Sequence, residues 1–119
     1  MEKSSHFDNL VIHYDGYMCR GFVTFREGGI SQATRELVNQ KYGKFLYVAD
    51  PQPSSHVWAE ATLIHYLDFL GGEIRRRRAQ LGLTGSDRAL VLMDQAGAHM
   101  SKTFSKLQKK WCIENNVAN

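Results

Sequence analysis

The clearest structural signal in the chain is the stretch ALVLMDQAGAHMSKTFSKLQKKWCIENN, residues 89–116. Its first six residues, 89–94, form an unbroken apolar run that ends at Asp94, which predicts a strand buried on both faces. The segment QAGAH then predicts a turn, and from Ser101 on the spacing predicts an amphipathic helix with a basic outer side. The apolar face of this helix comprises Phe104, Leu107, Trp111 and Cys112, and its lysines are Lys102, Lys106, Lys109 and Lys110.

A second, longer helix is predicted upstream, from near Val57 to about Leu83. The pair Gly71-Gly72 interrupts it at a cost of roughly 1 kcal/mol per glycine relative to alanine, so a kinked helix and two shorter helices both fit. Glu73 can pair with Arg77 one turn later, and a glycine-containing loop follows. The apolar positions of one face are Leu63, Ile64, Leu67, Leu70, Ile74 and Leu81.

The first half of the chain predicts a hairpin followed by a helix and a short strand. Residues 9–14 and 17–25 are apolar and aromatic segments that flank an Asp15-Gly16 turn. A helix over 31–43 with Ser31 as its cap is expected next, then a strand over 44–50 and a proline-containing loop. The fold class is therefore α/β, with a mixed sheet, formed by the N-terminal hairpin and the buried strand 89–94, layered with helices.

Composition narrows the class of protein. The 119 residues allow one domain, and 43% hydrophobic and 23% charged residues exclude a collagen-like, low-complexity or highly charged disordered chain. No apolar run approaches the ~20 residues of a membrane span, and the opening residues lack the apolar stretch of a secretory signal. We therefore expect a soluble intracellular protein without a membrane partner. Cys19 and Cys112 form no metal-ligand spacing and are expected to be buried free thiols.

Asp94 is the strongest candidate for chemistry. A carboxylate at the carboxyl end of a buried strand points to the sheet edge where α/β proteins bind ligands, and carboxylate oxygens suit Mg²⁺. The alternative is that Asp94 caps the turn before the last helix. His99 lies at the mouth of the same turn, where it would contact a phosphate, orient water or simply brace the structure. Asp15 and Asp50 also end apolar runs, although plain turn roles fit both.

Basic residues offer a second kind of site. The run Arg75 to Arg78 and the lysines of the last helix could contact a phosphate backbone, and the net charge of +3 permits nucleic-acid binding without requiring it. Four successive helical residues point around most of the circumference, so a solvated face with ion pairs is the favoured reading of the arginine run. For Trp58 and Trp111, core packing is favoured over base stacking.

These features together resemble a known family. The segment from Ser54 to Trp111 is similar to the middle of the DDE superfamily endonuclease domain of eukaryotic transposable elements, of the mariner and pogo type. In that family a loop that contains serine and either histidine or asparagine precedes a tryptophan. A long helix then ends in a basic stretch, and an apolar strand of the form LLxxDxxxxH leads to another helix. The matching residues here are Ser54, Ser55, His56, Trp58, the run Arg75 to Arg78, Asp94 and His99.

The resemblance implies a partial RNase H-like fold and a metal-dependent nuclease. Three acidic residues of such a domain hold two divalent cations, Mg²⁺ or Mn²⁺, for DNA cleavage and joining, and Asp94 takes the position of the second acid. It further implies DNA as the partner, contacts from His99, Arg75, Arg76, Lys102 and Lys106 to nucleic acid, and a nuclear location.

The chain also departs from the family pattern. The family's first acid would precede the hairpin and its third acid would follow residue 119, so we expect residues 1–119 to be one partial domain that is inactive by itself and whose unpaired sheet position favours self-association. A transposon-derived nucleic-acid-binding or interaction module without catalysis is the alternative. An unrelated phosphoryl-transfer enzyme ranks last, because the run VLMDQAG lacks the second aspartate that haloacid-dehalogenase-like phosphatases use. Whether the chain is an enzyme is left open.

Overall fold

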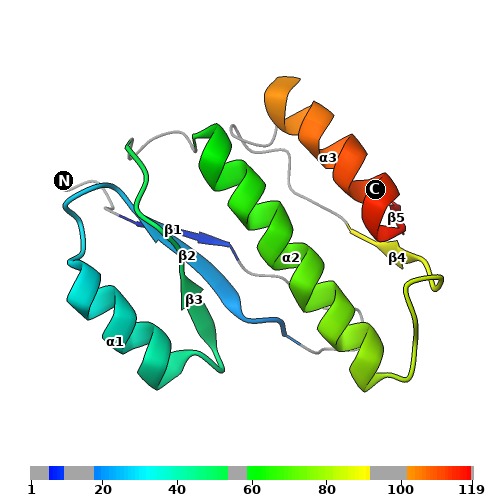
Figure 1. The fold of residues 1–119 in the computed structure, drawn as a ribbon, viewed down its shortest axis with the longest axis horizontal. Helices are drawn as coiled ribbons and strands as arrows, with labels where there is room; N and C mark the ends of the chain where they lie inside the picture. The colour runs from blue at the N-terminus through cyan, green and yellow to red at the C-terminus, as the bar shows by residue number, and fades with distance from the viewer. Residues whose placement is uncertain (1–5, 10–17, 54–58, 92–101, 119) are drawn as a thin grey trace. The chain divides into compact units, whose positions relative to one another are not determined.

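The computed structural model describes residues 6–9, 18–53, 59–91 and 102–118, and these show a mixed α/β fold (Figure 1). The chain divides into two compact units, Met1–Thr62 and Leu63–Asn119, which are treated separately below. The N-terminal unit contains the strands β1 (His6–Asn9), β2 (Gly21–Phe25) and β3 (Leu46–Val48) and the helix α1 (Gln32–Tyr42). The C-terminal unit contains most of helix α2 (Glu60–Gln80) together with β4 (Ala89–Leu90), α3 (Lys102–Asn115) and β5 (Val117–Ala118).

The N-terminal unit is built on a three-stranded mixed sheet with the order β1-β2-β3. Strand β1 (His6–Asn9) runs antiparallel to β2 (Gly21–Phe25), and β2 runs parallel to β3 (Leu46–Val48). The predicted antiparallel pairing is confirmed, but the described first strand begins earlier than the predicted 9–14. Its register pairs His6 with Phe25, which is the register that a two-residue turn at Asp15-Gly16 would require; the turn itself lies outside the described residues.

Helix α1 (Gln32–Tyr42) connects the parallel strands β2 and β3 and has the predicted ends. The Ser31 hydroxyl oxygen accepts a hydrogen bond from the Thr34 amide at 3.1 Å, which satisfies one of the free donors of the first turn, and Gly43 follows the last residue. Asn39 of this helix then reaches the edge of β3: its Nδ2 donates to the Val48 carbonyl at 2.9 Å and its Oδ1 accepts from the Val48 amide at 2.8 Å. The side chain thus covers backbone groups that an edge strand otherwise leaves open.

Helix α2 (Glu60–Gln80) is one continuous helix through Gly71-Gly72, so the alternative of two shorter helices is wrong. Val57 and Trp58 lie outside the described residues. The last residue of the helix is Gln80, and Gly82, with φ of +72°, lies just beyond it. The Leu83 amide donates to the Arg78 carbonyl at 2.7 Å and the Gly82 amide to the Ala79 carbonyl at 3.1 Å. This is a Schellman motif, which favours glycine because of its left-handed backbone.

Gly71 lies where α2 approaches α3 (Lys102–Asn115) closely. A Cβ atom at Gly71 would come within 3.2 Å of both Trp111 Nε1 and Asn115 Oδ1, and within 3.3 Å of Arg75 Nη1, whereas Gly72 is far less crowded. The helix-breaking residue at position 71 is therefore explained by packing between the helices within the C-terminal unit.

The C-terminal unit ends in a small parallel pair, β4 (Ala89–Leu90) with β5 (Val117–Ala118). In the described residues this pair is a separate two-stranded sheet and does not extend the N-terminal one. Leu90 is 64% exposed, so the expectation of a strand buried on both faces is wrong at this position, and residues 92–94 lie outside the described residues. Pairing with β5 covers one edge of β4 and not its faces, and the Leu90 side chain is exposed to water.

The buried side chains follow the helix faces only in part. In α2, Leu63, Leu67, Leu70 and Ile74 are buried as predicted, whereas Ile64 and Leu81 are exposed, and Tyr66 is buried without having been predicted. In α3, Phe104 and Trp111 are buried as predicted, and Leu107 and Cys112 are half-buried. Cys19 of the other unit is buried and is not part of a disulfide.

Candidate nucleic-acid interface

Of the residues that the sequence singles out for chemistry, the structure describes Arg75, Arg76, Lys102 and Lys106. Asp94 and His99 lie outside the described residues, so their predicted roles stay predictions. Within the described ranges, no group of three histidine, cysteine, aspartate or glutamate side chains is placed to hold a metal ion. The basic residues of α2 and α3 are therefore the part of the predicted site whose geometry is available.

Each arginine of the run 75–78 has a partner inside the C-terminal unit. Arg75 Nη1 donates to Asn115 Oδ1 at 3.1 Å, and Arg77 Nη1 donates to Gln80 Oε1 at 3.2 Å. Arg76 forms an ion pair with Glu73 at 3.1 Å, and the pairing of Glu73 with Arg77 stays a prediction. Glu73 is only 2% exposed, so the Arg76 guanidinium also compensates a buried carboxylate.

Arg78 is the buried member of the run, at 7% exposure. Its Nη1 donates to the Asn115 carbonyl at 3.0 Å and its Nη2 to the Asn116 carbonyl at 3.1 Å. The last carbonyls of a helix have no partner within the helix, and the negative end of the helix dipole attracts a cation. Arg78 therefore caps the C-terminus of α3 and fixes it to α2.

Asn115 and Asn116 complete this junction. The Asn115 Nδ2 group donates back to the Trp111 carbonyl at 2.9 Å. Asn116 has a left-handed backbone with φ of 54°, a conformation that asparagine tolerates better than most residues, and it ends the helix. Its carbonyl also accepts from the Ala89 amide at 3.1 Å, and its Nδ2 donates to the Gly85 carbonyl at 3.1 Å. The junction thus joins α2, α3 and β4.

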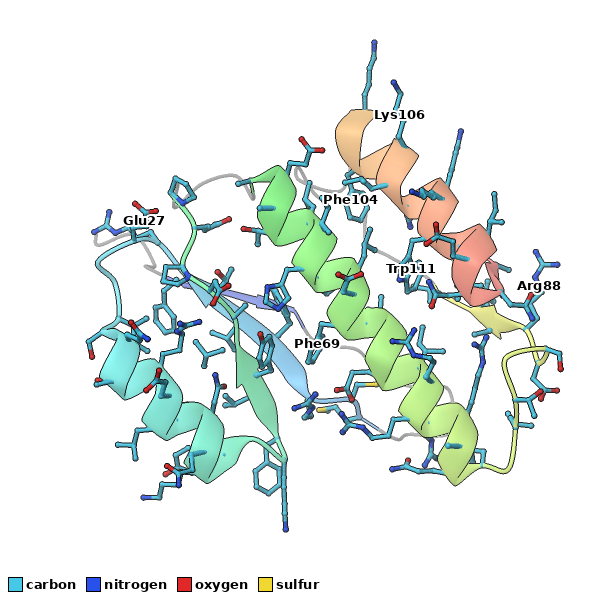
Figure 2. All side chains as sticks on the ribbon, in the orientation of Figure 1. Glu27, Phe69, Arg88, Phe104, Lys106 and Trp111 are labelled. Carbon is cyan, nitrogen blue, oxygen red and sulfur yellow. The ribbon has the colours of Figure 1, made fainter. Side chains whose placement is uncertain are left out.

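The outer face of α3 carries the exposed lysines that the sequence predicts. These are Lys102, Lys106, Lys109 and Lys110. Phe104 and Trp111 lie about half a helical turn away from them and are at most 5% exposed. Figure 2 shows Lys106 extending away from the helix, whereas Phe104 and Trp111 lie on its other side. The predicted amphipathic helix with a basic outer side is confirmed.

Charge is distributed unevenly between the two units. Residues 63–119 contain nine lysines and arginines against five aspartates and glutamates, whereas residues 1–62 contain six against seven. The net positive charge of the chain therefore comes entirely from the C-terminal unit. A concentrated excess of this kind is what attracts a polyanion.

The N-terminal unit uses its candidate acid internally. Asp50 pairs with Arg35 of α1, and the Asp50 carbonyl accepts a hydrogen bond from the buried Thr24 hydroxyl at 3.2 Å. Burial, and then the nearby Asp50 charge, raise the pKa of the Tyr47 hydroxyl, while Arg35 and Arg20 lower it. These contacts agree with the structural reading of Asp50 and give it a partner other than a metal ion.

Sequence reasoning missed three residues that organise the molecule, namely Arg78, Asn116 and Asn39. Asn116 had a local signal, because an asparagine directly after a helical pattern is a known C-terminal cap. Arg78 and Asn39 had none, because their partners lie elsewhere in the chain.

Comparison with known proteins adds no relative. No protein-family model, no curated protein and no solved structure matches this chain. No helix among residues 6–9, 18–53, 59–91 and 102–118 combines the length and apolar character needed to cross a membrane. The class that the structure itself defines is a mixed α/β protein with a basic C-terminal unit.

Proposed function

We propose that this chain is the inner part of a DDE-type endonuclease domain, with a partial RNase H-like fold, in a transposase that cuts and joins DNA. One observation carries the proposal: the order of a long helix ending in arginines, an apolar strand, Asp94 with His99 five residues later, and a basic helix. The described elements α2, β4 and α3 follow one another in that order and agree with it.

In this proposal Asp94 is the metal-ligating and catalytic residue that the chain contributes. A pair of Mg²⁺ or Mn²⁺ ions would activate the attacking hydroxyl and stabilise charge on the phosphate. In the family that this chain resembles three acids hold the metal ions, and we place the other two in the larger domain, so this chemistry is assigned to the larger domain and not to residues 1–119 alone. A nuclear location belongs to the same proposal, since the substrate is genomic DNA.

The nuclease proposal is tested in two steps. The 119-residue chain, incubated with plasmid DNA and Mg²⁺ or Mn²⁺, is expected to leave the DNA uncut. The complete reading frame that contains it is expected to cut, and Asp94→Asn is expected to abolish cutting while DNA binding remains. Neighbouring coding sequence without two further acids would contradict the proposal, and so would cutting that survives Asp94→Asn.

A second candidate is a nucleic-acid-binding module without catalysis. The observation that favours it is the excess of basic over acidic residues in the C-terminal unit, displayed on the outer face of α3. This function predicts salt-dependent DNA binding that persists in Asp94→Ala and without divalent cations. Binding that requires both Asp94 and Mg²⁺ would exclude it in favour of the nuclease.

A further inference from the structure

Three of the lysines of α3 form a straight line along the helix. Lys102, Lys106 and Lys109 are spaced i, i+4 and i+7, which places them on one face, and all three are exposed. Ile113, four residues further on, continues the same line and is 83% exposed. We call these four residues the α3 stripe.

The lysines of the stripe differ from the other basic residues of α2 and α3 in having no ion-pair or hydrogen-bond partner among the described residues. No ion pair among the described residues involves Lys102, Lys106 or Lys109, whereas Lys110 lies 3.8 Å from Glu114. The arginines of α2 are occupied by Asn115, Glu73, Gln80 and the end of α3. These three lysines thus form a continuous line of positive charge without an ion-pair partner in the described part of α3.

We propose that the α3 stripe docks onto the sugar-phosphate backbone of duplex DNA. At a rise of about 1.5 Å per residue, Lys102 and Lys109 are about 10 Å apart along the helix, and phosphates of one strand follow one another every ~3.4 Å along the duplex axis. The three lysines over this length can each neutralise one phosphate of the duplex, which carries one negative charge per ~1.7 Å of its axis. Ile113 at the end of the line makes the apolar contact with a sugar.

This inference rests on the nucleic-acid binding in the proposed function and changes its residues. Arg75 and Arg76, which the sequence assigns to DNA, are held in place by contacts within the unit and are given a structural role instead. Lys109 and Ile113 take their place beside Lys102 and Lys106.

The rest of α3 argues against an anionic membrane as the partner. A helix that lies in a membrane interface inserts an apolar face between the lipids. The apolar face of α3 is buried within the protein, with Phe104 at 0% and Trp111 at 5% exposure, so it is not available for insertion. A single exposed isoleucine among lysines fits a polyanion better.

The test compares two triple variants that remove the same charge. Lys102→Gln, Lys106→Gln and Lys109→Gln form the stripe variant, and Arg26→Gln, Lys41→Gln and Lys44→Gln form the control, in which exposed residues of the N-terminal unit are changed. Binding of the 119-residue chain to a 20-base-pair duplex is measured by fluorescence anisotropy between 50 and 200 mM salt. Circular dichroism confirms that both variants remain folded.

The stripe variant is expected to lose about 2.7 from the slope of log affinity against log salt, at about 0.9 per phosphate contact. Between 50 and 200 mM salt, wild-type affinity would therefore fall about 40-fold more than that of the stripe variant, and the control would keep the wild-type slope. Ile113→Ser is expected to lower affinity several-fold at every salt concentration without changing the slope, because the lost contact is apolar.

The possible failures are distinguishable. If the wild-type chain binds DNA and the stripe variant keeps its slope, the stripe is not the docking surface, while the proposed nucleic-acid binding stands. If the wild-type chain shows no salt-dependent binding to DNA, both are refuted. Binding to phosphatidylserine vesicles in place of DNA would also overturn the inference.

Discussion

Arg78→Met is the substitution that most directly tests how the C-terminal unit is held together. Methionine keeps most of the length and the apolar packing of the arginine stem but removes the guanidinium. The change leaves the Asn115 carbonyl without the 3.0 Å hydrogen bond from Arg78 and the Asn116 carbonyl with only the Ala89 amide. It also removes the positive charge from the negative end of the α3 dipole.

The expected cost follows from these two contacts. A hydrogen bond to a charged group contributes about 1.5–3 kcal/mol, and a partly buried cation at a helix C-terminus up to about 2 kcal/mol. Both bonds come from one guanidinium and are not independent, so we expect a total loss of about 3 kcal/mol in the free energy of unfolding. With an m-value of about 1.5–2 kcal/mol/M in urea, the unfolding midpoint would fall by about 1.5–2 M.

The assay is urea unfolding followed by circular dichroism and tryptophan fluorescence, for which the buried Trp111 is a reporter within the unit. Arg78→Lys keeps the charge but lacks the planar fork that reaches two carbonyls, so it should lose about half as much stability. Arg88→Met is the matched control, since Arg88 is exposed. If Arg78→Met lowers the midpoint no more than Arg88→Met does, the C-terminal capping role is refuted.

Three further outcomes are expected. Gly72→Ala should raise the free energy of unfolding by up to about 1 kcal/mol, because alanine favours the helix. Gly71→Ala should raise it less, since the new Cβ atom would meet α3 side chains at 3.2 Å. Equal gains of the two variants in thermal melts would contradict this packing. Asn39→Ala should lower the free energy of unfolding by about 2 kcal/mol and increase self-association measured by sedimentation, because the edge of β3 loses two hydrogen bonds. The control Gln40→Ala, on the same helix, should have neither effect. Burial raises the pKa of the Cys112 thiol, so less thiolate exists at pH 8. In a variant whose other cysteine is replaced by serine, alkylation should therefore be slower in the folded chain than in urea. Equal rates would refute this.

Local patterns predicted the helices and several of their ends. Ser31 caps helix α1 by accepting a hydrogen bond from the amide three residues later, and Gly43 directly follows the last helical residue. Both ends of the helix can therefore be predicted from a few neighbouring residues. The basic and apolar faces of α3 follow from helical periodicity in the same way. Features of this kind are predictable because cause and effect lie within one turn of the chain.

The arginine run shows where such reasoning stops. Four arginines occupy positions 75–78, and helical periodicity predicts only that their side chains point in different directions. Arg78 is set apart by the carbonyls of Asn115 and Asn116, which are 37 and 38 residues away and are unsatisfied only because α3 ends there. The buried guanidinium is a consequence of tertiary packing, and no local pattern distinguishes it from its neighbours.

Apolar content likewise overstated the burial of the described part of the strand predicted at 89–94. A continuous apolar run is typical of a strand covered on both faces, yet Leu90 is 64% exposed, and the pairing of β4 with β5 covers an edge of the strand and not its faces. Burial depends on which elements cover a strand, and that information lies outside the strand's own sequence. Asp94 was predicted from the same run, so its role has to be established by the Asp94→Asn experiment and not by the pattern.

The two findings about basic residues are physically connected. A stripe of lysines binds a rigid duplex well only if the lysines stay aligned, because each disordered side chain or frayed turn adds an entropic cost on binding. The Arg78 cap stabilises the turn of α3 next to Ile113, and the buried Phe104 and Trp111 hold its inner face. The position of each basic residue therefore decides its role. Arginines of α2 that reach the end of α3 fix this helix, and lysines on the outer face of α3 remain available for phosphates.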